Sequence, residues 1–198
     1  MRIRRKTASI PPGSIIFDLD GTIIDSGPVY QKLAAARGYT VQGPDANYNR
    51  LREQIPGDIL AELDRAYMGD GTKNALPVPD ALDVVRDFST NVYIVTARGT
   101  EFERPGRSWV QRHLPVFPQD HIISSPSTAA KGRFLADLEL ALVVDDQIAP
   151  LKIIPESTKR LLFDPDGAFP DEGVAGLQVV RSWADIRKIL ESTYKPKL

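Results

Sequence analysis

The sequence predicts an α/β fold in which a parallel, Rossmann-like sheet carries helices on both faces. Short apolar runs rich in β-branched residues alternate along the 198-residue chain with segments of helical periodicity. Strands that alternate with helices pair in parallel, because each helix returns the chain to the same edge of the sheet. One stretch near the N-terminus breaks this alternation, and there we expect a small helical insertion.

The first predicted strand covers residues 14–17, which are apolar after the leading serine and stop before an acidic residue. Such a short, continuous apolar run is typical of a buried parallel strand. A helix is expected next, over residues 26–38. Ser26 can cap it, Pro28 suits its first turn, and Gly38 can end it.

Residues 26–77 as a whole form the predicted insertion. Their helical pattern is interrupted by glycine and proline at several points. The core of the fold would then consist of residues 14–25 and 78–198. Residues 1–13 are basic and end in Pro-Pro-Gly, which favours a solvated tail, with a phosphate-contacting arm as the alternative.

The remaining elements alternate regularly between strands and helices. Strands are expected at residues 91–96, 121–124, 141–144 and 160–163, and helices at residues 80–88, 101–114, 128–138 and 182–192. Ser127 or Thr128 can cap the third of these helices.

The composition excludes several kinds of site. The chain has no Cys, which rules out disulfides, thiolate zinc sites, iron–sulfur clusters and a cysteine nucleophile. Its two histidines, His113 and His121, cannot form a three-histidine metal site and are expected to be structural. The 25 Lys and Arg residues nearly balance the 26 Asp and Glu residues, which argues against a dominant nucleic-acid interface.

No segment of the sequence predicts a membrane span or a secretory signal. The apolar runs stay well short of the roughly 18 residues that a span requires. Residues 1–13 lack the apolar stretch of a signal peptide. We therefore expect a cytoplasmic protein without a membrane partner.

Reactive side chains follow three of the predicted strands and begin one of the predicted helices. Residues 18–22 (Asp-Leu-Asp-Gly-Thr), 96–98 (Thr-Ala-Arg) and 145–146 (Asp-Asp) end the strands, and Lys131 lies in the first turn of the helix. In parallel sheets, ligands bind beyond the carboxyl ends of the strands. We therefore expect these four segments to meet at one edge.

The chemistry of these residues favours phosphoryl transfer. Carboxylates that lie close together repel, so they need a cation or raised pKa values. Their oxygens suit Mg²⁺, which takes phosphate readily as a further ligand. Thr96 and Lys131 donate hydrogen bonds and therefore suit an anion. A metal, anion-binding donors and a further carboxylate together meet the requirements of phosphoryl transfer.

These residues also resemble the haloacid dehalogenase (HAD) superfamily of phosphohydrolases. The resemblance covers residues 14 to about 192. The matching motifs, in the order that the family has them, are Asp18-Leu19-Asp20-Gly21-Thr22, Thr96, Lys131 and Val143-Val144-Asp145-Asp146. The resemblance implies a phosphomonoester hydrolase whose helical cap, at residues 26–77, excludes water and contacts the leaving group.

The resemblance also implies a role for each motif residue. Asp18 is the nucleophile that forms an aspartyl-phosphate, and Asp20 protonates the leaving oxygen and then activates water. Thr96 and Lys131 bind the phosphoryl oxygens. The implied Mg²⁺ ligands are Asp18, the backbone carbonyl of Asp20, Asp145 and Asp146. The further substrate-binding candidates are Gly21, Thr22, Ala97 and Arg98.

A second resemblance concerns the substrate. Residues 109–115, 162–164 and 182–186 are similar to segments of the 5′(3′)-deoxyribonucleotidases, which favours a nucleotide. That family has Val at the position of Thr22 and no Arg at the position of Arg98. The Thr-Ala-Arg segment also resembles polynucleotide 3′-phosphatase domains. A nucleic-acid end or a sugar phosphate is therefore the second candidate substrate, and a catalytically silent scaffold for a phosphorylated partner is the alternative to an enzyme.

Several residues remain open to two interpretations. Arg98 faces either the substrate or the solvent. Asp164-Pro165-Asp166-Gly167 mimics the first motif, but its proline and glycine predict a turn. Other residues could contact substrate but are expected to be ordinary packing or surface positions, namely Tyr30, Tyr48, Arg50, Arg52, Trp109 and Trp183.

Overall fold

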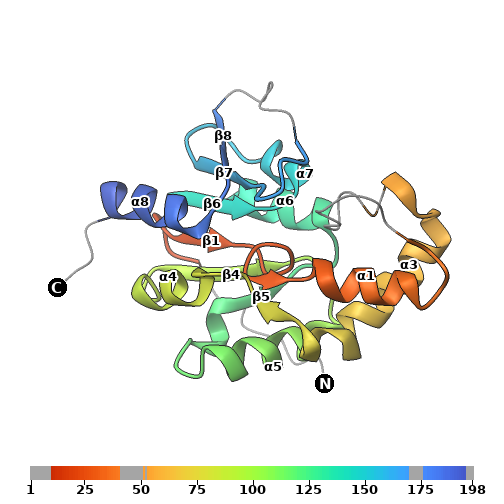
Figure 1. Cartoon of the computed structure of the whole chain (residues 1–198). Coiled ribbons are helices and arrows are strands. Elements are labelled where there is room, and N and C mark those ends of the chain that lie inside the picture. The colour runs from red at the N-terminus through yellow and green to blue at the C-terminus, as the bar shows by residue number, and fades with distance from the viewer. Residues whose placement is uncertain (1–9, 41–50, 52, 170–175, 195–198) are drawn as a thin grey trace, which may run out of the picture.

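The computed structural model of the chain describes residues 10–40, 51, 53–169 and 176–194. Its centre is a parallel sheet with the strand order β5-β4-β1-β6-β7-β8 (Figure 1). The strands are β1 (Ile15–Phe17), β4 (Val92–Thr96), β5 (Ile122–Ser124), β6 (Leu142–Asp145), β7 (Lys159–Phe163) and β8 (Leu177–Val180). The predicted parallel α/β fold is confirmed.

Strand β1 occupies the middle of the sheet, between β4 and β6. Ile15 pairs with Val92 on one side and with Leu142 on the other. Every residue of these three strands is buried. Because both faces of the sheet are covered, their sequences are apolar up to the last residue of β4, Thr96, and of β6, Asp145. The segments that follow three parallel neighbours necessarily emerge at the same edge.

Two apolar layers cover the sheet. Ile15 and Phe17 belong to the layer that contains α4 (Ala81–Asp87), α5 (Glu103–His113) and α8 (Trp183–Thr193). Ile16 belongs to the opposite layer, with α6 (Thr128–Ala136) and α7 (Ile148–Leu151). Neighbouring strand residues separate in this way because side chains alternate between the faces of a strand.

The helical insertion extends from the carboxyl-end edge of the sheet. It is bounded by a short antiparallel hairpin of β2 (Ile24–Asp25) and β3 (Leu76–Pro77). Between these strands lie α1 (Gly27–Ala35), α3 (Gly57–Met68) and the 3₁₀ helix η1 (Asp70–Asn74), of which the two α-helices are labelled at the right of Figure 1. The hairpin thus connects the insertion directly to the segment that follows β1.

The structure corrects several element predictions. Helix α1 ends at Ala35 and not at Gly38, and the side chain of Ser26 at its N-cap makes no capping hydrogen bond. Ser127, and not Thr128, caps α6, where its hydroxyl accepts a hydrogen bond from the amide of Ala130. Strands β2, β3 and β8 were not predicted. Strands β2 and β3 have two residues each, too few to show a period, and Gln178 interrupts the apolar run of β8.

The predicted tail is described from Ile10 onward. Ile10 is buried in the same apolar layer as Ile16, so this end of the tail packs on the core. Residues 1–9 and three of the predicted surface positions, Tyr48, Arg50 and Arg52, lie outside the described residues. No helix within the described ranges is both long and apolar enough to cross a membrane.

Candidate active site

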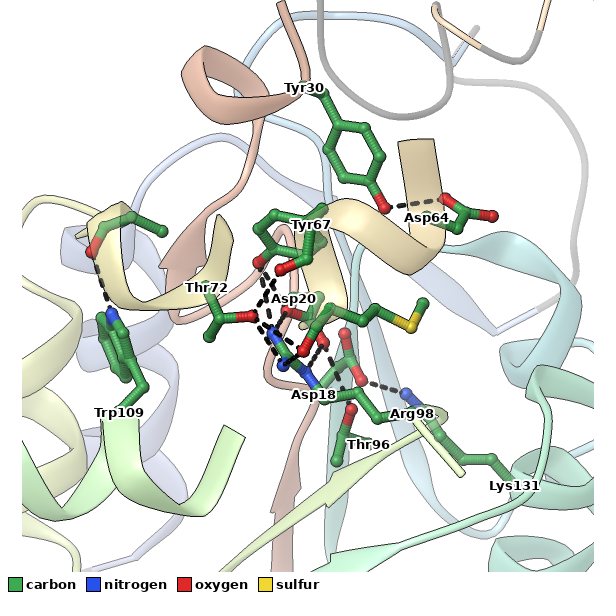
Figure 2. A network of polar contacts seen from close by, with 12 residues as sticks. Asp18, Asp20, Tyr30, Asp64, Tyr67, Thr72, Thr96, Arg98, Trp109 and Lys131 are labelled. Carbon is green, nitrogen blue, oxygen red and sulfur yellow. Dashed lines mark hydrogen bonds and ion pairs between the residues drawn. The ribbon is translucent and has the colours of Figure 1, made fainter. Parts of the chain in front are cut away.

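The predicted site residues meet at the carboxyl-end edge of the sheet. Figure 2 shows that Asp18, Asp20, Thr96, Arg98 and Lys131 converge there from β1, from β4 and from α6. They line a cavity of about 360 Å³, together with the predicted residues Ala97 and Asp146. The convergence follows from the strand order, because the ends of β4, β1 and β6 are neighbours.

Three of the carboxylates form a compact acidic cluster. Asp18, Asp145 and Asp146 are buried, and one oxygen from each lies within 4.8 Å of the others. Burial raises the pKa of Asp18 to about 7 against the opposing charge of Lys131, and Asp145 and Asp20 add to the rise. Burial and the charges of Asp18 and Asp145 likewise raise the pKa of Asp146 well above its ordinary value. Three hard oxygen ligands under mutual repulsion fit a divalent cation.

Lys131 supplies the positive charge next to this cluster. Its ammonium group donates to Asp18 and forms an ion pair with Asp145, at 2.7 Å. Burial favours the neutral amine, but the charges of Asp145 and Asp18 prevail and raise the pKa of Lys131 above its ordinary value. The side chain therefore stays protonated. It lies one turn after the Ser127 cap of α6, which aims it at the end of β1.

Asp20 has a separate set of partners. Arg98 donates to both of its carboxylate oxygens, with Nε at 2.8 Å from Oδ2. The Tyr67 hydroxyl donates to Oδ1 at 2.6 Å, and the Thr96 hydroxyl lies 3.3 Å from Oδ2. Burial alone would raise the pKa of Asp20, but the charge of Arg98 and these hydrogen bonds lower it below its ordinary value. In this arrangement Asp20 is a carboxylate.

The position after Asp20 requires a glycine, Gly21, because of its backbone conformation and its closeness to Asp146. Gly21 has φ +78°, and a Cβ placed on it would lie 2.3 Å from Oδ2 of Asp146. Thr22 follows but does not reach the cavity: it is fully buried, and its carbonyl accepts a hydrogen bond from the Trp183 indole at 2.9 Å. Substrate contact by the Thr22 side chain is therefore not supported, because the chain turns inward after Gly21.

The structure also corrects the two interpretations of Arg98. This residue is neither a surface arginine nor an open cationic group, since it is only 2% exposed and pairs with Asp20. Its further partners, Met68 and Thr72, come from the insertion. Neither these residues nor Tyr67 was identified from the sequence, because a single hydroxyl or carbonyl inside a helical pattern carries no local signal of function.

Both tryptophans and both histidines have structural roles, whereas Tyr30 lies at the cavity. Trp109 and Trp183 are each 1% exposed and fill the core, as predicted. The Nδ1–H of His121 donates to the carbonyl oxygen of Val92, at 2.9 Å, and His113 lies against Trp109. The Tyr30 ring lies against Tyr67, with centroids 4.6 Å apart, and its hydroxyl donates to Asp64. Both Tyr30 and Tyr67 line the cavity.

Comparisons with known proteins identify the fold. No protein-family model and no curated protein matches the chain. Among solved structures, a HAD-family hydrolase from Deinococcus radiodurans with bound phosphate and sodium matches with a TM-score of 0.57. It is 16% identical, and the match covers 93% of this chain and 97% of that chain.

Two further solved structures give the same result. A haloacid dehalogenase-like protein of unknown function from Agrobacterium tumefaciens has a TM-score of 0.58 at 14% identity, over 92% of this chain and 99% of that one. A HAD hydrolase from Bacillus subtilis, bound to magnesium, has a TM-score of 0.56 at 14% identity, over 90% and 98%. The chain therefore has the fold of the haloacid dehalogenase superfamily hydrolases.

Proposed function

We propose that this protein is a Mg²⁺-dependent phosphomonoester hydrolase that works through an aspartyl-phosphate on Asp18. The observation that supports this most strongly is the cavity itself. It joins an acidic cluster bound to Lys131 with a second carboxylate, Asp20, that is held separately. A nucleophile, a proton carrier and an anion-binding cation are thus present in one space.

In the first step, an oxygen of Asp18 bonds to phosphorus while the bond between phosphorus and the ester oxygen breaks. Asp20, a carboxylate in this structure, takes up a proton before this step and gives it to the departing oxygen. An ammonium group has three N–H donors. Because Lys131 donates to Asp18 and pairs with Asp145, it keeps at least one donor for a phosphoryl oxygen. Thr96 lines the same cavity, and its hydroxyl, which donates to Asp20 at 3.3 Å, can turn to a phosphoryl oxygen.

In the second step, Asp20 acts as a carboxylate and takes a proton from a water molecule. The water oxygen bonds to phosphorus, the bond between phosphorus and Asp18 breaks, and inorganic phosphate leaves. The Arg98 contacts that favour the ionised form of Asp20 suit this step. Proton donation in the first step and proton removal in the second return Asp20 to its starting state.

The acidic cluster fits the proposed metal. Asp18, Asp145 and Asp146 would hold Mg²⁺ through side-chain oxygens, with the backbone carbonyl of Asp20 as a further ligand. When bound, the ion supplies positive charge that offsets the charge developing on the phosphoryl group. The hydrolase from Bacillus subtilis, which has the same fold and is bound to magnesium, supports this choice. The one from Deinococcus radiodurans, with bound phosphate and sodium, supports a phosphoryl ligand.

We assign residues 26–77 the role of a cap that encloses the leaving group, with a nucleotide as the first candidate substrate. Tyr30, Tyr67 and Met68 bring apolar surface from the insertion to the cavity, and aromatic surface suits a nucleobase. The described residues of the cavity hold two cations, Arg98 and Lys131, and both are engaged by carboxylates. Such a lining suits a single phosphate on an uncharged alcohol.

A nucleic-acid end is the second candidate, because a basic groove lies beside the insertion. This groove, of about 430 Å³, is lined by Lys73 of η1 and by Arg104 and Arg112 of α5, with Asp70 as an acidic member. Gly69 lines the groove and its neighbour Met68 lines the active-site cavity. A chain of phosphates could therefore continue from one space to the other.

The test is a phosphate-release assay with the purified chain. The substrates are 5′- and 3′-nucleoside monophosphates in ribo and deoxy forms, sugar phosphates and 3′-phosphorylated oligonucleotides. We expect hydrolysis with Mg²⁺, loss of activity with EDTA, and a phosphorylated Asp18 in acid-quenched peptides. Absence of hydrolysis throughout, together with phosphate-ester binding, would favour the silent scaffold; equal slow rates on all esters would refute nucleotide specificity.

A further inference from the structure

Arg98 joins three parts of the molecule that are distant in sequence. It lies just after β4, and its guanidinium side chain is fully buried. Its Nε and one terminal nitrogen donate to Asp20, which follows β1. Its other terminal nitrogen donates to the carbonyl of Met68 at 3.2 Å and to the hydroxyl of Thr72 at 2.8 Å, both in the insertion (Figure 2).

These contacts use the whole hydrogen-bonding capacity of the side chain. A guanidinium group has five N–H donors. Two are directed at Asp20, one at Met68, one at Thr72, and one at the Tyr67 hydroxyl at 3.4 Å. With five donors and five acceptors, Arg98 has none left for a phosphoryl oxygen. Its effect on a reaction must therefore pass through the groups that it holds.

The partners of Arg98 are themselves interlocked. The Tyr67 hydroxyl donates to Asp20, and the Thr72 hydroxyl donates to the carbonyl of Tyr67 at 2.7 Å while it accepts from Arg98. The Arg98 guanidinium also lies 5.4 Å from the centroid of the Tyr67 ring. The carboxylate of Asp20 thus accepts hydrogen bonds from Arg98 of the core and from Tyr67 of the insertion.

The neighbouring helix leaves room for this arrangement. A Cβ on Gly106 of α5 would lie 3.1 Å from Cδ of Arg98 and 3.3 Å from Leu19. These distances are tighter than ordinary van der Waals contact, so glycine at this position lets the arginine stem pass between α5 and the end of β1. The local sequence is in this way adapted to a buried arginine.

We infer that Arg98 is a positioning residue that couples the seating of the cap to the orientation of Asp20. This inference rests on the proposed function, because it assigns to Asp20 the protonation of the leaving group. A two-pronged contact fixes the plane of a carboxylate, which a single point charge does not. A carboxyl group displaced by about 1 Å from its acceptor can lose about 100-fold in rate.

The test compares two esters of nearly equal size, phenyl phosphate and 4-nitrophenyl phosphate. Phenolate is a strong base and needs a proton to leave, whereas 4-nitrophenolate is a weaker base and leaves without one. For Arg98→Ala, we expect kcat/KM to fall about 100-fold on phenyl phosphate and less than about 10-fold on 4-nitrophenyl phosphate, with KM little changed. Arg86→Ala removes an exposed arginine of α4 that is paired with Asp83 and should alter neither value.

Two more variants keep the test decisive. Arg98→Lys retains the positive charge but loses the paired N–H donors that hold both oxygens of Asp20. Its activity on phenyl phosphate should stay well below that of the wild type. Tyr67→Phe removes one hydrogen bond to Asp20 and keeps the ring. We expect its kcat/KM on phenyl phosphate to fall about 3- to 10-fold more than its kcat/KM on 4-nitrophenyl phosphate. If Arg98→Ala does not fold, the comparison of the two esters with Tyr67→Phe still tests the inference. Guanidinium ion in the buffer should partly restore phenyl phosphate hydrolysis by Arg98→Ala.

Other outcomes separate this inference from the proposed function. If both esters lose the same factor and KM rises in Arg98→Ala, the arginine binds substrate and the inference is overturned. Full activity of Arg98→Lys on phenyl phosphate would overturn it as well. If the wild-type chain cleaves neither these esters nor the substrate panel, the proposed function itself has failed.

Discussion

Two segments of this chain have the same Asp-x-Asp-Gly sequence, and the structure gives them different roles. Residues 18–21 follow β1, and residues 164–167 follow β7. Each segment ends in a glycine with positive φ, +78° at Gly21 and +68° at Gly167. The two aspartates and the positive φ of the glycine therefore do not distinguish the segments, although Pro165 predicts a turn in the second.

The neighbouring strands account for the difference. Beside β1, the strand β4 and the residue after β6 bring Thr96 and Asp146 to the same cavity. The segment after β7 turns back on itself. The carboxylate of Asp164 accepts hydrogen bonds from the amides of Ala168 and Phe169, at 2.8 and 3.1 Å, and pairs with Arg181, which follows β8. The turn predicted at residues 164–167 is confirmed, and its aspartate serves the fold.

The sharpest test of this contrast is Asp18→Asn. The amide keeps the volume of the side chain but cannot form an acyl phosphate, so we expect phosphatase activity to fall at least about 1,000-fold. The free energy of unfolding should change little or increase, because a buried charge is removed. Steady-state kinetics and thermal unfolding check both. Retention of more than a tenth of the activity would contradict the assignment of Asp18 as nucleophile.

The two glycines provide the next comparison. In Gly21→Ala the new methyl group would displace the Asp146 carboxylate, so we expect about 10- to 100-fold lower kcat/KM and a higher Mg²⁺ concentration for half-maximal activity. Gly167→Ala meets only Arg181, at 3.6 Å. It should therefore cost about 1 kcal/mol of stability through its positive φ and leave activity unchanged. Equal effects on activity would abolish the distinction between the segments.

Asp164→Asn tests the structural role of the second segment. An amide has one oxygen fewer with which to accept hydrogen bonds from the Ala168 and Phe169 amides and to pair with Arg181. We expect the free energy of unfolding to fall by about 2 kcal/mol, measured by urea denaturation. Below the unfolding transition, kcat and KM should match the wild type. A selective loss of kcat would instead place Asp164 in the active site.

The smallest effect is expected from Asp146→Asn in the absence of metal. The pKa of Asp146 is higher in the folded protein than in the unfolded chain, so the folded protein binds more protons between these two pKa values. The free energy of unfolding therefore falls as the pH rises from the ordinary pKa of an aspartate to the raised pKa of Asp146. Asp18 acts in the same direction between pH 3.8 and about 7. At pH 8, Asp146→Asn should therefore stabilise the metal-free protein by about 1 kcal/mol. Mg²⁺ should stabilise the wild type and have less effect on the variant.

Differential scanning calorimetry at pH 5 and pH 8, with and without Mg²⁺, measures these changes. The wild type should gain stability from acid and from Mg²⁺, since each removes repulsion among the three carboxylates. If Asp146→Asn destabilises the metal-free protein at pH 8, then Asp146 is held by stabilising hydrogen bonds and the repulsion has been overstated.

The fold and most of the site could be predicted because they depend on short-range patterns. Buried parallel strands are apolar throughout, and in a parallel sheet the reactive residues must follow the strands at one edge. Asp18, Thr96, Lys131 and Asp146 accordingly line one cavity. The hairpin strands β2 and β3, of two residues each, could not be found in this way, since they are defined by pairing across the insertion.

The amino-acid sequence was sufficient to place the carboxylates, the threonine and the lysine at one edge of a parallel sheet, because hydrophobic periodicity and strand order bring them there. The partners of these groups were decided by tertiary packing. Arg98 could have faced substrate or solvent, and only the seating of the insertion directs it to Asp20 and to Thr72. Long, flexible polar side chains reach many positions from one backbone site, so their contacts depend on which surfaces the folded chain brings within their reach.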